Sequence, residues 1–142
     1  MLTAEFNGAG IEAHYAQLQA KVGAAIRPAA QAGAQVLYDE VRLRAPRSDK
    51  PHSTKGKRYT FQPGNLQRAI YQAYATSQSV DGAVAVYDIS WNKSKAFYGG
   101  FVERGTRYIA ANSFLRDSYD AVQKDAKDEV RRVLRDRIKG AV

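Results

Sequence analysis

The 142-residue chain contains no cysteine, and this absence removes several classes of site at once. Disulfide bridges, iron–sulfur clusters, thiolate zinc sites and a cysteine nucleophile all require cysteine side chains. The sequence also lacks a run of about 20 apolar residues, the length that a membrane-spanning helix needs, and it does not begin with a basic region followed by an apolar stretch. We therefore expect a protein that is neither inserted in a membrane nor secreted, and that assembles in a reducing cytoplasm.

The motifs of common enzyme classes are missing as well. The chain has no GxxxxGKS/T phosphate loop, no GxGxxG, no HExxH and no GxSxG. Of its two histidines, His14 has no acidic partner four residues later and His52 lies in a basic segment. Adjacent acidic residues on a helix point in different directions and share a proton or metal poorly. We expect no enzymatic activity, no cofactor and no metal.

What the chain does have is positive charge, with 22 Lys and Arg against 14 Asp and Glu, a net charge of +8. Much of it lies between residues 42 and 58, where a single acidic residue accompanies a candidate basic arm of Arg42, Arg44, Arg47, Lys50, Lys55, Lys57 and Arg58. A basic patch of this kind favours an acidic partner such as nucleic acid. Residues 116–139 mix both signs instead, which is typical of the solvated face of a helix.

Prolines and glycines interrupt this basic segment. Pro46, Pro51 and Pro63 are incompatible with a regular helix, so residues 45–63 are predicted to form a long flexible basic loop. Long loops in compact domains are usually functional or disordered. Two interpretations stay open here: a hydrated insertion without a partner, or an arm that becomes ordered when it contacts DNA or a neighbouring subunit.

Two long amphipathic helices flank the middle of the chain. Apolar residues recur at intervals of three and four from Ile11 to Val41 and again from Phe114 to Ile138. Pro28 should kink the first helix or begin its second half. The alanines and glycines around Pro28 allow a close approach, either by the domain's own sheet or by another subunit. Ser113 or Asn112 is the expected N-cap of the second helix.

Between the helices, residues 70–77 and 83–91 are rich in β-branched and aromatic side chains, with the turn-forming pair Asp81-Gly82 between them. They predict an antiparallel hairpin. Residues 96–104 suit a short helix or a strand, and Glu103 is expected to accept backbone N–H groups or to pair with an arginine such as Arg116. The predicted fold is a single α+β domain over residues 1–142, with two amphipathic helices on a small antiparallel sheet.

The role of the aromatic residues is open as well, because the chain has nine tyrosines. Several fall in the predicted sheet region: Tyr71, Tyr74, Tyr87, Tyr98 and Tyr108. Tyrosines are favoured in strands and at protein interfaces, whereas aromatic side chains beside basic ones can stack on single-stranded bases. Both interpretations stay open, with packing or an interface favoured.

Two stretches resemble a known family. The first is Ala45-Pro46, a variable basic insert, and then Pro63-Gly64-Asn65-Leu66-Gln67-Arg68-Ala69-Ile70. The second is Tyr98-Gly99-Gly100-Phe101-Val102-Glu103-Arg104-Gly105-Thr106, followed by Ala111-Asn112-Ser113-Phe114-Leu115-Arg116. Their order and spacing are similar to those of tail-completion, or minor tail and neck, proteins of lambda-like long-tailed bacteriophages. The chain departs from that pattern at Ala69, where serine is usual, and at Ser113 and Asp117, where prolines are common.

The resemblance implies a structural virion protein without enzymatic activity, assembled in the host cytoplasm. Such proteins complete the tail and help to join it to the DNA-filled head, as part of an oligomeric ring around the DNA channel. The implied partners are the tail terminator, connector or head-completion proteins, and the basic arm would face a neighbouring subunit, an acidic connector surface or genomic DNA. The family-motif residues are Pro46, Gly64, Leu66, Ile70, Tyr98, Phe101, Glu103, Gly105, Thr106, Phe114, Leu115 and Arg116.

Two other interpretations compete with this one. A small basic nucleic-acid-binding protein would bind free DNA with a steep salt dependence. An enzyme such as a nuclease or a peptidase would need a metal-ligand or nucleophile set, and the sequence shows neither.

Overall fold

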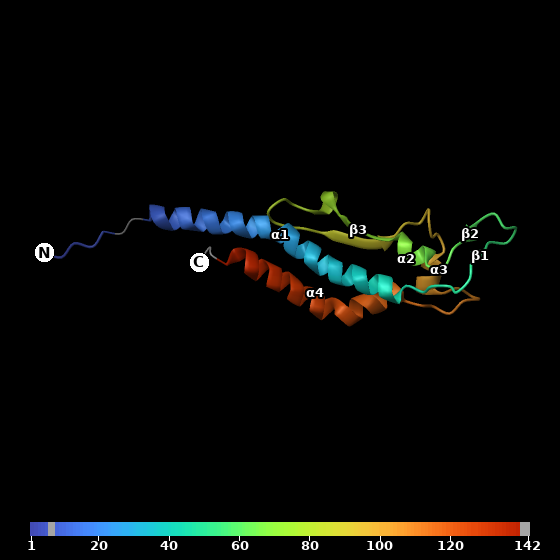
Figure 1. Cartoon of the computed structure of the whole chain (residues 1–142). Helices are drawn as coiled ribbons and strands as arrows, with labels where there is room; N and C mark the ends of the chain where they lie inside the picture. The colour runs from blue at the N-terminus through green and yellow to red at the C-terminus, as the bar shows by residue number, and fades with distance from the viewer. Residues whose placement is uncertain (6–7, 140–142) are drawn as a thin grey trace.

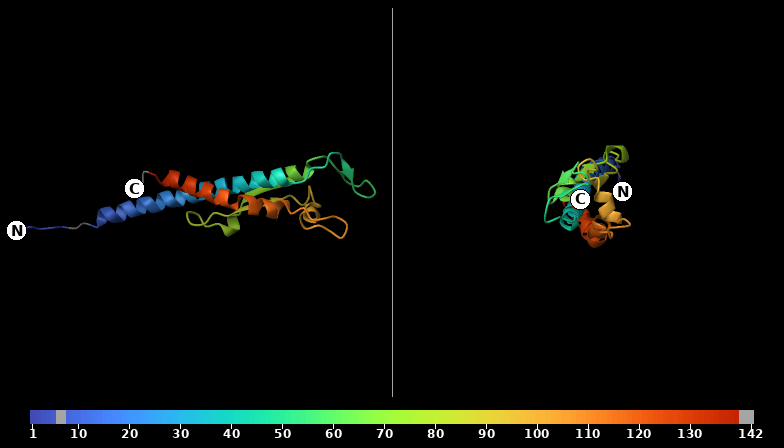
Figure 2. Two further views of the ribbon diagram at one scale, coloured as in Figure 1. Left: turned by 90° about the horizontal axis from the view of Figure 1, so that it is seen from below. Right: turned by 90° about the vertical axis from the view of Figure 1, so that its right-hand side faces the viewer.

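Two long antiparallel helices form the frame of the molecule. The computed structural model describes residues 1–5 and 8–139, and its class is α+β, as the sequence predicts. The helices α1 (Ala9–Arg44) and α4 (Phe114–Ile138) lie side by side, and the strands lie along α1 and beyond its C-terminal end (Figures 1 and 2). The remaining elements are β1 (His52–Ser53), β2 (Thr60–Phe61), α2 (Asn65–Ala69), β3 (Ile70–Tyr74), the 3-10 helix η1 (Thr76–Gln78), β4 (Tyr87–Trp91) and α3 (Gly99–Arg104).

Pro28 lies inside α1, which continues through it as one helix. Because proline has no backbone N–H and its ring crowds the preceding turn, it bends a helix that it does not end. The axis of α1 changes direction between its two halves (Figure 1). Of the two predicted outcomes, a kink or a new start, the structure therefore has the kink.

The small residues around Pro28 bring α1 close to α4. Ala25, Ala29 and Gly33 are buried. A Cβ atom added at Gly33 would lie 2.5 Å from Cγ2 of Val130 and 3.2 Å from the carbonyl oxygen of Ala126, both on α4. The prediction that this surface packs on the sheet or on another subunit is therefore wrong at Gly33, where it packs on the second helix of the same chain.

The strands β3 and β4 pair antiparallel, with Ile70 opposite Trp91 and Tyr74 opposite Tyr87. Both are shorter than predicted, because Ser79 takes over part of the ladder. Its hydroxyl donates to the Ala75 carbonyl oxygen (2.8 Å) and accepts from the Val86 N–H (3.0 Å). Residues 76–78 form η1 instead of strand, and the expected turn survives at residues 81–82, inside an isolated bridge between residues 80 and 84.

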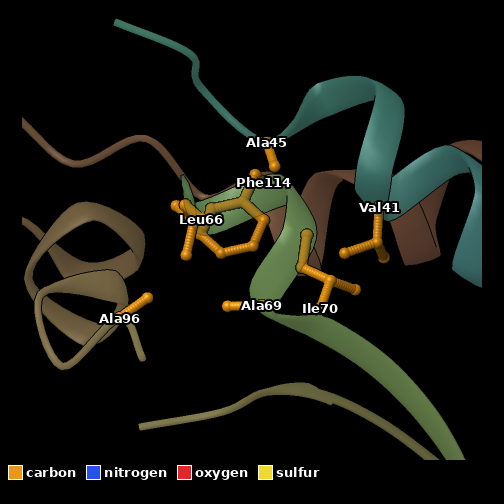
Figure 3. Packing of buried hydrophobic residues seen from close by; sticks show 7 residues of the cluster. All are labelled: Val41, Ala45, Leu66, Ala69, Ile70, Ala96 and Phe114. Atoms are coloured by element: carbon orange, nitrogen blue, oxygen red, sulfur yellow. The ribbon is translucent and has the colours of Figure 1, made fainter. Parts of the chain in front are cut away.

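The hydrophobic core lies where the C-terminal end of α1 meets α2 and the start of α4. Phe114 and Val41 are each 1% exposed, and Phe114 is the largest apolar side chain buried there. Figure 3 shows seven core side chains that converge from these elements, from β3 and from the segment before α3: Val41, Ala45, Leu66, Ala69, Ile70, Ala96 and Phe114. The Trp91 ring packs against Phe114 with the two ring centres 5.9 Å apart. Both stretches of the family motif contribute to this core.

Among the described residues, no helix is long and apolar enough to cross a membrane.

Candidate functional site

A short hairpin projects from the core end of the molecule and carries much of the basic arm (Figure 1). Within segment 45–63, predicted as an irregular loop, β1 and β2 pair antiparallel. The Ser53 and Thr60 hydroxyls lie 2.9 Å apart, and Thr54 N–H donates to the Tyr59 carbonyl oxygen (2.9 Å). At the tip, Gly56 has a φ of 85° and Lys57 a φ of 56°. Side-chain and backbone pairing at the base, with a tight left-handed tip, explains why this segment is not irregular throughout.

The seven predicted arm residues are all exposed but do not form one unit. Arg42 and Arg44 belong to the last turn of α1, where Arg44 Nε lies 2.6 Å from Glu40 Oε1 in an exposed ion pair. Arg47 and Lys50 precede β1, while the other three lie around the hairpin tip: Lys55, Lys57 and Arg58. The arm of the sequence prediction is therefore shorter, and it begins after the helix.

Aromatic rings hold the hairpin against the segment before α3. The Phe61 ring lies at the centre of this group, 4.9 Å from the Tyr98 ring, 5.5 Å from the His52 ring and 5.7 Å from the Phe97 ring. Tyr59 stacks on Phe61 at 6.5 Å. Aromatic pairs at these separations stabilise by about 0.5–1.5 kcal/mol beyond burial. Tyr98 was predicted as a motif residue, whereas Phe61 carries no motif and was missed.

An apolar pocket of about 450 Å³ opens beside this aromatic group. Four predicted motif residues contribute to its wall, namely Pro46, Gly64, Leu66 and Tyr98, together with Arg47 of the basic arm. Phe101, another motif residue, is 51% exposed at its edge. A mostly apolar hollow with basic residues nearby suits an apolar side chain presented on an acidic protein surface better than it suits a phosphate.

Two amides of the motif that the sequence analysis did not single out join the parts of the site. The Asn65 side chain donates to the Lys95 carbonyl oxygen (2.8 Å) and to the Tyr98 hydroxyl (3.1 Å). The Gln67 side chain donates to the carbonyl oxygens of Arg42 (3.2 Å) and Ala45 (3.1 Å) at the end of α1. Helix C-termini leave carbonyl groups without intrahelical partners, so Gln67 caps α1 from α2.

Glu103 caps the other long helix. Its carboxylate accepts the backbone N–H of Leu115 (2.9 Å) and of Arg116 (3.2 Å), in the first turn of α4. This confirms the prediction that Glu103 accepts backbone N–H groups, and its bond to Arg116 uses the main chain. Ser113 occupies the N-cap position, but its hydroxyl donates to the Glu103 carbonyl oxygen (3.3 Å) and makes no side-chain cap. The predicted N-cap position at Ser113 is confirmed, but the side-chain cap comes from Glu103, which reaches these N–H groups from α3.

We expect Glu103→Ala to lower the free energy of unfolding by about 1–2 kcal/mol, because two N–H groups at the start of α4 lose their acceptor. Glu103→Gln keeps one acceptor oxygen without the charge and should lose about half as much. Urea unfolding followed by circular dichroism measures both. The matched control is Asp117→Ala, an exposed carboxylate in the same turn, which should change stability by less than about 0.5 kcal/mol; equal losses at both positions would contradict the capping role.

The motif turn after α3 is closed by Thr106. Its Oγ1 accepts the N–H groups of Tyr108 (3.2 Å) and Ile109 (3.1 Å), and its own N–H donates to the Ile109 carbonyl oxygen (2.8 Å). Gly105 precedes it with a φ of 75°. The turn leaves Tyr108 85% exposed and Ile109 55% exposed beside the pocket, so the site has an apolar rim as well as a basic one.

The remaining motif residues lie in the core or at the start of a helix next to the site. Gly64, with a φ of 76°, is the N-cap residue of α2. Leu66, Ile70 and Phe114 are core residues, and Leu115 packs against them. Among residues 1–5 and 8–139, no group of three His, Asp or Glu side chains is placed to hold a metal ion. Away from the site, the hydrogen bond from Arg132 on α4 lowers the pKa of the partly exposed Glu129 carboxyl.

Comparison with known proteins finds no matching family model, no curated protein and no solved structure.

Proposed function

We propose that this chain is a structural component of the neck of a long-tailed bacteriophage. In this role it completes the end of the tail, helps to join it to the DNA-filled head, and assembles as part of a ring around the DNA channel. The proposal includes a virion location and no enzymatic activity. Its partners are a tail terminator, a connector or a head-completion protein.

The observation that carries this proposal is the convergence of the two motif stretches at one end of the fold. Asn65 in the first stretch bonds to Tyr98 in the second, and Glu103 in the second caps the helix that begins with Phe114. Residues that are scattered in the sequence thus build one rigid platform, and the basic hairpin projects from it. A rigid base with a projecting arm suits a subunit that must find its neighbour in an ordered assembly.

The charge of the hairpin supplies the second support. Lys55, Lys57 and Arg58 are exposed at its tip, and the apolar rim lies at its base. Charged residues at the edge of an interface chiefly raise the association rate, while apolar side chains at its centre contribute most of the affinity. An acidic neighbour with a protruding apolar side chain would use both features.

We expect Lys55→Glu/Lys57→Glu to weaken a complex with a tail-terminator or connector protein at least tenfold at low salt, since attraction becomes repulsion. Light scattering of the purified chain, alone and mixed with each candidate partner at low and moderate salt, measures the complex. Lys124→Glu/Lys127→Glu on α4 makes the same change of charge at another exposed surface and should leave it intact. Equal weakening by both pairs would contradict a role for the hairpin.

A second candidate function is binding of nucleic acid, favoured by the exposed aromatic and basic side chains at the hairpin, such as Tyr59 and Arg58. In that case the chain is a monomer that does not bind the neck proteins and binds a 30-base-pair DNA duplex. The logarithm of its binding constant then falls with the logarithm of salt concentration with a slope of several units. A stoichiometric complex or a ring with weak binding of free DNA favours the neck function instead.

A further inference from the structure

The N-terminal part of α1 carries an apolar row that the described chain covers only in part. The row is spaced by four and three residues, so its members lie on one face of the helix. Its members are Ile11, Tyr15, Leu18 and Val22. Their exposure decreases along the helix, from 58% and 68% at the first two to half-buried at the last two.

This row continues the contact between α1 and α4. The next positions on the same face are Ala25 and Ala29, which are buried, and then Gly33, which is packed against Val130 and Ala126 of α4. The helix α4 ends at Ile138, and α1 extends past that end (Figures 1 and 2). The exposed side chains thus belong to the face of α1 that packs on α4, and they lie beyond the point where α4 ends.

The composition of this segment is that of a covered helix. Residues 8–20 contain one charged side chain, Glu12, whereas 25% of the whole chain is charged. The N-cap residue of the helix, Gly8, provides no side-chain cap, and Gly10 is a poor helix former. Because helices in proteins derive most of their stability from packing of an apolar face, a partner along the apolar row would stabilise this end of α1.

We propose that the partner is the same row of a second copy of this chain, with the two helices antiparallel about a two-fold axis close to Ala13. Ile11 of each copy then lies opposite Tyr15 of the other. The incoming helix runs in the same direction as α4 and places its N-terminus near the C-terminal end of α4, an arrangement that helix dipoles favour. The incoming helix therefore packs on the same face of α1 as α4 does, and in the same direction.

Charge favours a second copy over a nucleic acid at this surface. Residues 1–20 contain no Lys or Arg, so they offer nothing to phosphate. Each copy carries a net charge of +8, much of it at the opposite end of the molecule. An antiparallel pair holds the two basic hairpins at its far ends, where their repulsion is smallest. This contact is independent of the proposed neck function, because a two-fold interface closes on itself and is not the repeating contact of a ring.

Sedimentation of the full-length chain tests the pairing. A row of four residues makes a small interface, so measurements from about 10 to 500 µM are needed. The wild-type chain should form dimers, and Ile11→Glu/Tyr15→Glu should raise the dissociation constant at least tenfold. The matched control, Ala13→Glu/Gln17→Glu, adds the same negative charge away from the row on the same exposed helix and should dimerise as the wild type does. Circular dichroism checks that both variants retain the helical fold.

Cysteine cross-linking tests the direction, since the natural chain has no cysteine. A mixture of Ile11→Cys and Tyr15→Cys chains should give a mixed disulfide on mild oxidation, because the antiparallel pair brings these positions within bonding range. Ile11→Cys alone should not. Three results would each overturn the proposal. The wild-type chain could remain a monomer at every concentration, the two double variants could have equal effects on dimerisation, or Ile11→Cys alone could form disulfide-linked dimers. None of these results bears on binding of neck proteins by the hairpin, which is measured separately.

Discussion

Phe114→Ala should lower the free energy of unfolding by about 3–5 kcal/mol, the usual cost of removing a buried aromatic ring. Phe114 is 1% exposed, packs against the Trp91 ring and begins α4, so the cavity opens where α1, α2 and α4 meet. Surrounding side chains there include Val41 and Leu66, which are held by separate elements and cannot collapse together. Urea unfolding followed by both circular dichroism and tryptophan fluorescence reports the loss, because the chain has one tryptophan.

The control for this prediction lies on the same helix. Tyr119→Ala also removes an aromatic ring from α4, at a position that is 50% exposed, and should cost less than about 1 kcal/mol. If the two substitutions destabilise equally, the junction beneath the motif residues is not the main core. If Phe114→Ala also abolishes partner binding at a temperature where the fold is intact, the core and the interaction site are coupled.

Gly105→Ala is the second substitution with a large expected effect, at least about 2 kcal/mol of stability. At this position φ is 75° and ψ is 172°, a conformation that side-chain-bearing residues avoid. An added Cβ would also lie 2.7 Å from the Ala111 nitrogen and 3.0 Å from the Ile109 carbonyl oxygen, which are backbone atoms of the turn and cannot rotate away. Thermal and urea unfolding give the loss directly.

Gly56→Ala separates the two contributions to that loss. Gly56, at the hairpin tip, has a φ of 85° but no atom within 4 Å of an added Cβ, so only backbone strain opposes the substitution. We expect a cost near 1 kcal/mol there. Equal costs at both glycines would show that strain alone acts at Gly105 and that the turn adapts to the methyl group.

The sequence predicted the parts of this fold that depend on local periodicity. The apolar spacing in residues 11–41 and 114–138 fixes both long helices within a few residues, and the Asp81-Gly82 pair identifies the turn between the longer strands. Glu103 could also be predicted as an acceptor of backbone N–H groups, since it is a carboxylate between an apolar pair and a chain break. These features follow from neighbours in the sequence.

Other features depend on residues that are distant in the sequence. Nothing near Ser79 indicates that its hydroxyl will replace a strand hydrogen bond, and nothing near Gly33 indicates that Val130 will press against it. The hairpin within segment 45–63 is similarly obscured, because two-residue strands are shorter than any reliable alternation and Phe61 is fixed by Tyr98 from another element. Tertiary contact decides in each case, and periodicity carries no information about it.

The placement of the basic hairpin at one end of a long molecule has a kinetic consequence. The hairpin and residues 8–20, which hold no Lys or Arg, lie at opposite ends of the molecule, along an axis set mainly by α1 (Figure 2). Such a separation gives the molecule an electric dipole moment, so the field of a polyanion or an acidic surface turns it before contact. The screening length at physiological salt is about 8 Å, so this torque acts only in the last moments of approach. The hairpin then makes the first contact with the partner, and the platform built by the two motif stretches is already oriented toward the partner surface.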